Sequence, residues 1–361
     1  MGVKLVFWGD TLLEKSLFDN EEVLEIANEA DLVSFNLETV ISNNALKKSD
    51  KAYNFIARED ALLKLKDAIK TPTLVNIANN HMLDFGSEGL YDTIDLLKKN
   101  NIDFVGLSIF GKKKSGVVFK DINGKRIAFI GAYRSSYLSN DKGEGFTNID
   151  QSLIDKTKLA KKMSDYLVVH LHWGEELSLS QNPNQVKIAK SLVDVGVDVI
   201  IGHHPHVIQN SEVYKKGFIS YSLGNFQMMT YDWNLETKYG LMLSVELESG
   251  KEIKIEKIPV FIDEKNSPKI IKKNSLHHSK YLKILESNLF LSKYNSWILF
   301  YSSVSKAFFE DNIRAWKRRY SNGEKNLLKK ILFWFIVPRT IKMLLCYPLG
   351  RVYRVIIYFS K

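Results

Sequence analysis

The sequence predicts an α/β fold whose central strands run largely parallel. Short apolar runs of strand length alternate with amphipathic helical patterns through the first two-thirds of the 361 residues, an order typical of βαβ units. A hydrophobic fraction of 45% and a charged fraction of 25% are those of an ordinary globular protein. The single cysteine, Cys346, excludes a disulfide framework and a thiolate metal site. A metal bound here would therefore use histidine, asparagine and carboxylate ligands.

The elements of this α/β core follow one another in a regular order. Strands are predicted at residues 3–8, 32–36, 73–78, 104–106, 126–132, 166–171 and 197–201. Helices are predicted at residues 21–29, 59–69, 87–100, 152–163 and 184–195. Ser87 is the predicted N-cap of the third helix, and Gly196 follows the fifth as a C′ glycine would.

After Gly217 the pattern changes to strands joined by turns. Residues 218–223, 239–247 and 251–261 have strand character, with turn residues between the last two. We expect the core to finish with antiparallel strands and to end near residue 265, with an exit loop at 265–269. The first domain is therefore predicted to span residues 1–265.

A second region, residues 280–361, is predicted to be a helical, aromatic and basic extension. Residues 281–361 hold 15 basic and 4 acidic side chains, an excess of 11 in a chain whose net charge is +10. The rest of the chain is close to neutral, so we expect no nucleic-acid partner, which would need a basic surface. The extension is either a helical cap or oligomer contact, or a segment that lies in a membrane interface through residues 325–361.

The chain begins directly with a strand pattern and shows no secretory signal or run of 18 uncharged apolar residues. We therefore expect a cytoplasmic location, with peripheral contact at the inner face of the membrane.

Three of the eight histidines lie within residues 202–206, the sequence Gly-His-His-Pro-His, at the end of an apolar strand. Imidazole is the commonest metal ligand in proteins. His204 and His206 are two residues apart and can point toward one ion, whereas His203 flanks the pair. Taken alone, this cluster is equally compatible with a loop that is merely rich in histidine.

Four other predicted strands also end in polar side chains of the metal-binding type. They supply Asp10, Glu38, the pair Asn80-His81, and His172. In α/β sheets the ligand site lies beyond the carboxyl ends of the strands. This donor set suits one or two divalent transition-metal ions, Mn, Fe or Zn, better than Ca. Two such ions, bridged by Asp10 or Glu38, would activate a hydroxide for phosphoryl transfer, with His81 as proton donor or charge stabiliser.

Six sequence blocks together resemble the CapA family of bacterial capsule and poly-γ-glutamate synthesis proteins, a branch of the calcineurin-like metallophosphoesterase superfamily. The order and spacing of the blocks agree with that family across roughly residues 3–260. The blocks, in one-letter code, are GD at 9–10, NLET at 36–39, NNHMLDFG at 79–86, HWGEE at 172–176, GHHPHVIQ at 202–209 and YSLGNF at 221–226.

The resemblance implies a four-layer αββα sandwich of two mixed sheets with metals at the strand ends. It assigns Asp10, Glu38, Asn80, His172, His204 and His206 as metal ligands, and His81 and Asp84 as catalytic residues. Asp84 either contacts substrate or orients His81. Glu176 and Asn225 are expected to hold imidazole tautomers, and His170 to be a buried supporting histidine. The chain departs from the parent superfamily at two positions: Leu12 stands where a histidine is usual, and Glu38 replaces an aspartate.

Two functions remain open at this point. The first is a metal-dependent phosphoesterase that acts on a phosphorylated or polyanionic polymer or its precursor during exopolymer assembly. The alternative is a non-catalytic accessory subunit that keeps the fold and supports a membrane-bound exopolymer synthase through the basic extension.

Overall fold

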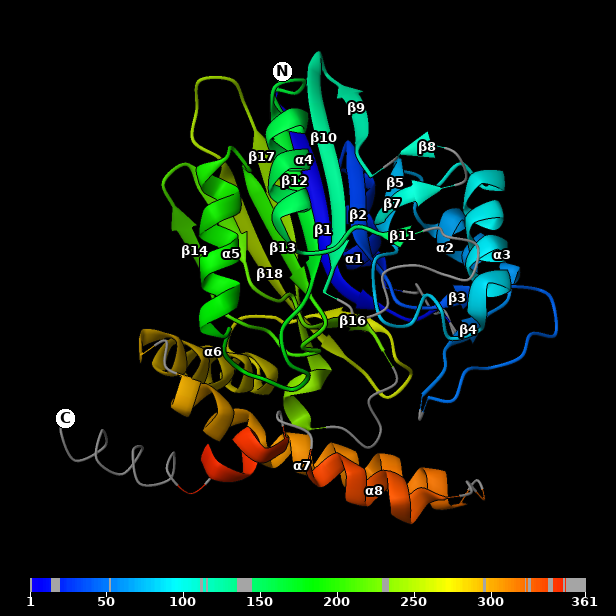
Figure 1. Ribbon diagram of the computed structural model, residues 1–361. Coiled ribbons are helices and arrows are strands. Elements are labelled where there is room, and N and C mark those ends of the chain that lie inside the picture. The colour runs from blue at the N-terminus through cyan, green and yellow to red at the C-terminus, as the bar shows by residue number, and fades with distance from the viewer. Residues whose placement is uncertain are drawn as a thin grey trace.

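In the computed structural model, two mixed β-sheets pack face to face and helices cover their outer faces (Figure 1). The structure describes residues 2–13, 20–51, 53–110, 113–114, 116–134, 145–228, 234–294, 297–321, 323, 326–336, 340–346 and 348.

The first sheet is built around β1, which has parallel strands on one side and a series of antiparallel strands on the other. Its order is β19-β18-β17-β1-β2-β5-β6, with β16 also paired to β1. Strands β2, β5 and β6 continue parallel to β1. On the other side, each of β17, β18 and β19 is antiparallel to the strand before it in the sheet. The bounds are β1 Val3–Thr11, β2 Leu32–Leu37, β5 Thr73–Asn76, β6 Asp103–Val105, β16 Asn225–Gln227, β17 Tyr239–Leu247, β18 Lys254–Ile262 and β19 Pro268–Ile270.

The second sheet has the order β14-β15-β13-β12-β10-β9, with four parallel central strands and an antiparallel strand at each edge. Its strands are β9 Val118–Ile122, β10 Lys125–Tyr133, β12 Tyr166–His172, β13 Val199–His203, β14 Ser211–Tyr214 and β15 Gly217–Ser220. Two small sheets lie beside the sandwich and contain β3 Val40–Ile41, β4 Ile56–Ala57, β7 Leu107–Phe110, β8 Lys113–Lys114 and β11 Gly145–Phe146.

Successive side chains along each strand point to opposite faces of its sheet, one toward the other sheet and one toward the helices, and so pack four layers together. In β1, Leu5 and Phe7 point to the core between the sheets, whereas Val6 and Trp8 point to the helices. The helices on the side of the first sheet are α1 Glu21–Asn28, α2 Glu59–Ala68 and α3 Gly86–Lys99. The helices on the side of the second are α4 Gln151–Lys161 and α5 Pro183–Asp194. The predicted αββα sandwich is therefore confirmed.

Two glycines allow the strand ends to approach one another. A Cβ atom on Gly9 would lie 1.8 Å from the carbonyl oxygen of Gly224, and one on Gly202 would lie 1.9 Å from that of Tyr221. Both distances are far below any contact that a side chain can make. The glycine at each position therefore brings β1 against residues 224–225 and β13 against residue 221, and this places Asn225 opposite Asp10.

Every predicted core strand and helix is present, with ends that differ by up to three residues. The predicted N-cap at Ser87 is wrong, because α3 begins at Gly86 and its cap residue, Phe85, offers no side-chain acceptor. The exit loop expected at 265–269 is partly strand, since Pro268 and Lys269 pair with β18. Strand β9 was not predicted.

The basic extension forms α6 Leu276–Tyr294, α7 Trp297–Ser321 and α8 Leu327–Phe335, which lie below the sandwich in Figure 1. Tyr281 and Ile284 of α6 are buried in the core between the sheets. The short 3₁₀ helix η1, Leu235–Lys238, precedes β17. Among the described residues, no helix is both long and apolar enough to cross a bilayer.

Candidate metal centre

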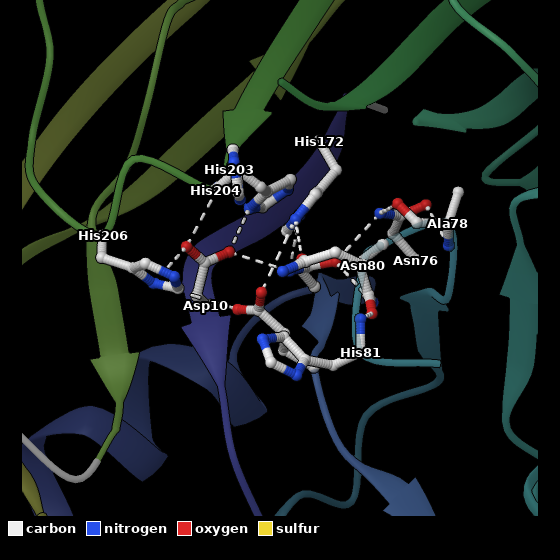
Figure 2. A network of polar contacts seen from close by, with 12 residues as sticks. Asp10, Asn76, Ala78, Asn80, His81, His172, His203, His204 and His206 are labelled. Atoms are coloured by element: carbon white, nitrogen blue, oxygen red, sulfur yellow. Dashed lines mark hydrogen bonds and ion pairs between the residues drawn. The ribbon is translucent and has the colours of Figure 1, made fainter. Parts of the chain in front are cut away.

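The polar side chains predicted at five strand ends meet at one edge of the sandwich (Figure 2). Asp10 is in β1, Glu38 follows β2 and Asn80 follows β5. His172 ends β12, and the segment 204–206 follows β13. Because the parallel strands of both sheets end at this edge, residues far apart in the sequence become neighbours.

Asp10 is fully buried and lies between two imidazoles. Its Oδ1 is 3.4 Å from His203 Nδ1, and its Oδ2 is 3.3 Å from His206 Nδ1. Oδ2 also accepts a hydrogen bond of 3.1 Å from the backbone N–H of His204. Burial opposes ionisation of Asp10, but these contacts outweigh it and hold the pKa of the carboxyl well below its usual value. Asp10 is therefore an anion at neutral pH.

His172 lies between the amide groups of two asparagines. Its Nε2 is 2.7 Å from Asn80 Oδ1, and its Nδ1 is 3.3 Å from Asn36 Nδ2. Asn36, on β2, also donates to Asp10 Oδ1 at 2.8 Å, so it joins His172 of the second sheet to Asp10 of the first. Burial lowers the pKa of His172 well below 6.5, so its imidazole is neutral, the form that binds metals.

Glu38 occupies the centre of the group, and its environment fits a cation. Its Oε1 is 3.6 Å from His172 Nε2, and its Oε2 is 4.0 Å from His206 Nδ1. Neither of these buried oxygens has a hydrogen-bond partner among the described residues. Burial, followed by the charge of Asp10, raises the pKa of Glu38 well above its usual value. A divalent cation would satisfy both oxygens and offset the cost of burying the charge.

Three sets of side chains each place their ligand atoms within 4.8 Å of one another. The sets are Glu38, His172 and His204; Glu176, His204 and His206; and Asp10, Glu38 and His206. The structure thus brings together five of the six predicted metal ligands, and the sixth, Asn80, contacts His172 directly. Glu176, predicted only as a supporting partner, lies among the ligands as well. The carboxylate, imidazole and amide donors suit a divalent metal ion.

The loop that carries the histidine pair has an unusual backbone. His204 and His206 have φ values of +96° and +58°, in the left-handed region that residues other than glycine rarely adopt. Such conformations cost roughly 1–3 kcal/mol each and persist where surrounding contacts enforce them. The hydrogen bond from His204 N to Asp10 and that between His206 Nδ1 and Asn225 Oδ1, 2.9 Å, hold this loop.

Behind the ligand candidates lies a second line of buried histidines. His203 Nε2 is 3.0 Å from His170 Nδ1, and His170 Nε2 is 2.9 Å from Ser34 Oγ. Sequence reasoning treated His203 as a flank, but the structure places it against Asp10. Leu12, which stands where the superfamily has a histidine, is buried and apolar. The imidazole that lies against Asp10 Oδ1 is instead that of His203.

His81 is held by Asp84, which lies three residues later in the same turn. His81 Nδ1 is 2.7 Å from Asp84 Oδ2, and Asp84 also accepts from Lys51 Nζ at 2.6 Å and from Phe55 N at 2.9 Å. Because Asp84 is fully buried, these contacts favour an orienting role over contact with substrate. Lys51, which also donates to the carbonyl of Asn80, carried no sequence signal.

Metal binding at this site is expected to release protons. Burial works against the charge of His206, but Glu38 and Asp10 raise its pKa to about 10. At pH 7 the metal-free site therefore holds a proton on His206, which a ligated imidazole must lose. Apparent affinity should rise about tenfold per pH unit for each proton displaced, up to the pKa of His206. Calorimetry of Mn²⁺ binding in buffers of different ionisation enthalpy measures this release; a pH-independent affinity would contradict it.

Two stacked mixed sheets with carboxylate, amide and imidazole side chains at their carboxyl ends define a protein of the metallophosphoesterase-like fold class. The chain belongs to the bacterial capsule synthesis protein family PGA_cap, whose family model matches residues 4–229, more than half of its length.

Relatives and solved structures resemble part of the chain. The capsule biosynthesis protein CapA of Bacillus anthracis is 35% identical over 66% of this chain and 60% of its own. The PGA biosynthesis protein CapA of Bacillus subtilis (strain 168) is 32% identical over 68% of this chain and 65% of its own. The chain thus spans less than two-thirds of each relative. A solved structure of a putative 5′-nucleotidase from Staphylococcus aureus is 13% identical, with a TM-score of 0.46, over 78% of this chain and 58% of that one.

Proposed function

We propose that this protein is a metal-dependent phosphoesterase-like enzyme of capsule or poly-γ-glutamate biosynthesis. The environment of Glu38 carries the proposal: two buried carboxylate oxygens without hydrogen-bond donors among the described residues, surrounded by imidazoles. The names of the two Bacillus relatives support the biosynthetic setting. The substrate class is a phosphorylated or polyanionic polymer or its precursor.

Asp10, Glu38, Asn80, His172, His204 and His206 would hold one or two divalent ions, with Glu176 beside them. A bound ion lowers the pKa of water, generates a nucleophile at neutral pH and stabilises charge on phosphoryl oxygens. His81, fixed through Nδ1 by Asp84, presents its other ring nitrogen for proton transfer to a leaving group. Asn225 fixes the ring of His206.

The second candidate function is that of a non-catalytic accessory subunit of an exopolymer synthase. One observation favours it: the buried Leu12 removes an imidazole that the superfamily uses for metal binding. Turnover of a broad panel of phosphomonoesters and phosphodiesters with added Mn²⁺ separates the two functions. Turnover that depends on metal supports the enzyme, and no turnover by protein that binds metal supports the accessory subunit.

We also propose that the outer face of α8 contacts an anionic membrane surface. Leu328, Leu332 and Phe333 are 71%, 62% and 66% exposed, and the exposed lysine Lys329 lies between them in the sequence of α8. Exposed apolar side chains interleaved with lysine suit an interface of acyl chains and anionic headgroups. The other side of the extension packs internally: Phe300, Val304 and Met343 form a small core.

A double variant with Leu332→Asp and Phe333→Asp is expected to lose at least about tenfold in affinity for phosphatidylglycerol vesicles, since it removes apolar area and adds repulsive charge. Leu159→Asp is the matched control, because Leu159 is 63% exposed on the distant α4. Vesicle co-sedimentation measures the change. Equal binding by wild type and double variant, or no binding by either, would exclude the membrane contact.

A further inference from the structure

The core between the two sheets contains three polar side chains that the proposed chemistry does not use. Ser34 of β2, His170 of β12 and His203 of β13 are all fully buried. Their surroundings are apolar: Phe7 and Ile201 belong to the same core, and the ring of Phe7 lies 5.8 Å from that of His170. Burying polar groups among such side chains is unfavourable unless they are hydrogen-bonded. Apolar residues at these positions would avoid that cost, so packing alone does not account for them.

These side chains form a continuous line from one sheet to the other and back. Ser34 Oγ is 2.9 Å from His170 Nε2, and His170 Nδ1 is 3.0 Å from His203 Nε2. The planes of the two imidazoles are 7° from parallel. His203 Nδ1 lies 3.4 Å from Asp10 Oδ1 (Figure 2), just beyond the roughly 2.7–3.2 Å of an N–H···O hydrogen bond. The line thus begins on β2 and ends on the neighbouring strand β1.

The number of protons fixes the direction of the line. A neutral imidazole donates from one ring nitrogen and accepts at the other, and a serine hydroxyl donates once. The three side chains therefore offer three protons for three contacts. Because the Asp10 carboxylate can only accept, the proton of the last contact lies on His203 Nδ1. His203 Nε2 then accepts from His170 Nδ1, and His170 Nε2 accepts from Ser34 Oγ, so every donor points toward Asp10.

At the end of this line, Asp10 Oδ1 lies between two donors. Asn36 Nδ2 donates to it at 2.8 Å, and the Asn36 amide is itself fixed because its Oδ1 accepts from Asn76 Nδ2 at 3.0 Å. The N–H of His203 approaches Oδ1 from the other sheet. With Oδ1 held in this way, the other oxygen, Oδ2, faces His206, which shares a candidate ligand set with Asp10. Oδ2 is therefore the oxygen of Asp10 available to a metal ion.

We propose that Ser34, His170 and His203 form a hydrogen-bond relay that positions Asp10 to bind metal through Oδ2 alone. The three are positioning residues, since they act on the ion only through Asp10. The inference rests on the proposed function and deepens it, because it names the residues that set the ligand geometry of Asp10. The relay also ties the two sheets together where their ligands meet, since His203 belongs to the second sheet and Asp10 to the first.

Calorimetry of Mn²⁺ binding to the full-length protein tests the relay. His170→Phe keeps a ring beside His203 but removes both nitrogens, and it is expected to weaken binding roughly 10–100-fold, the contribution of residues that support a metal ligand. Ser34→Ala removes only the far end of the relay and should weaken binding at least about threefold. Ser220→Ala is the matched control, because Ser220 is a buried serine on β15 whose hydroxyl has no hydrogen-bond partner among the described residues.

Nitrogen-15 NMR of the histidine side chains in the metal-free protein adds a readout that packing alone would not set. It reports which ring nitrogen carries the proton. His170 and His203 are both expected to carry it on Nδ1. A proton on Nε2 of His203 instead would leave Nδ1 free to bind metal directly and would overturn the relay.

Wild-type Mn²⁺ affinity in both relay variants, or an equal loss in Ser34→Ala and Ser220→Ala, would also overturn the inference. Ser34→Ala and the tautomers decide the matter if His170→Phe does not fold. Failure of the relay is distinguishable from failure of the proposed function. Weakened Mn²⁺ binding in both variants of a protein without phosphoester turnover supports the relay and removes the enzyme. Turnover combined with unweakened binding in both variants removes the relay alone.

Discussion

Replacing Glu38 with glutamine is expected to abolish metal binding and, at the same time, to stabilise the metal-free protein. The carboxylate lies in two of the three candidate ligand sets, so its loss should cost more than the roughly 10–100-fold in affinity that supporting residues contribute. In the absence of metal its raised pKa shows that the folded state disfavours the charge. Removing that charge should therefore stabilise the metal-free fold, on the order of 1 kcal/mol.

The sign of the stability effect depends on pH. A carboxyl group whose pKa is raised on folding destabilises the protein above its unfolded pKa and has no effect once it is protonated in both states. The gain in Glu38→Gln should thus be present at pH 7 and absent near pH 3. Urea unfolding in EDTA measures this gain. Mn²⁺ at 100 times its dissociation constant for the wild type should add about 2.7 kcal/mol to the free energy of unfolding of the wild-type protein, and far less to that of the variant.

Glu246→Gln serves as the control for this experiment, because Glu246 lies on β17 and its side chain is about half exposed, paired with Lys254 at 3.2 Å. It should leave metal content and stability near those of wild type. A Glu38→Gln protein with wild-type metal stoichiometry, or one less stable in EDTA, would refute the assignment of Glu38.

His81→Ala is expected to lower kcat by about 10²–10⁴-fold, the range that a general acid or base contributes, with metal content unchanged. His81 lies outside all three candidate ligand sets, and its Nδ1 is committed to Asp84. Asp84→Asn should lower kcat less, because it keeps an oxygen that can accept from His81 while weakening the contact with Lys51. Steady-state turnover with Mn²⁺, together with elemental analysis, measures both effects.

Two results would contradict this role for His81. Loss of metal in His81→Ala would make the residue a ligand, and unchanged kcat would make it a structural residue. Lys51→Met is a useful companion variant, since Lys51 touches Asp84 and the Asn80 carbonyl but carries none of the proposed chemistry.

The layered fold was predictable because each core strand is buried on both faces and reads as a short apolar run. Strand β1 is an example: nearly every residue from Val3 to Thr11 is buried. The edge strand β9 was not predicted, because its residues are half-buried or exposed and do not form an apolar run. Its hairpin turn, Asn123-Gly124, has positive φ values of 50° and 73° and was a signal that could have found it.

The candidate ligands were predictable for a different reason: each follows directly on a strand end. Their partners were not, because those contacts cross between sheets. Asn36 reads as an ordinary strand residue, yet it joins Asp10 to His172. Lys51 comes from a loop that packs on α3 and α8, where Asp50 pairs with Lys330 at 3.0 Å.

His277 shows where sequence reasoning stopped short. It lies in the first turn of α6, ahead of the extension predicted from residue 280, and packs against Phe261, with ring centroids 3.7 Å apart. Burial lowers its pKa. A short polar segment between two elements gave no indication that a helix would start there and dock on the sheet.

The central claim is that the strand ends form a transition-metal site around Glu38, and anomalous X-ray scattering tests it most directly. Crystals grown with Mn²⁺ should show one or two anomalous peaks at the manganese edge, bordered by Glu38, His172, His204, His206 and Asp10. The same data from Glu38→Gln crystals should show these peaks lost or strongly reduced. A wild-type map without a peak at the strand ends, or with its only strong peaks elsewhere on the molecule, would contradict the account.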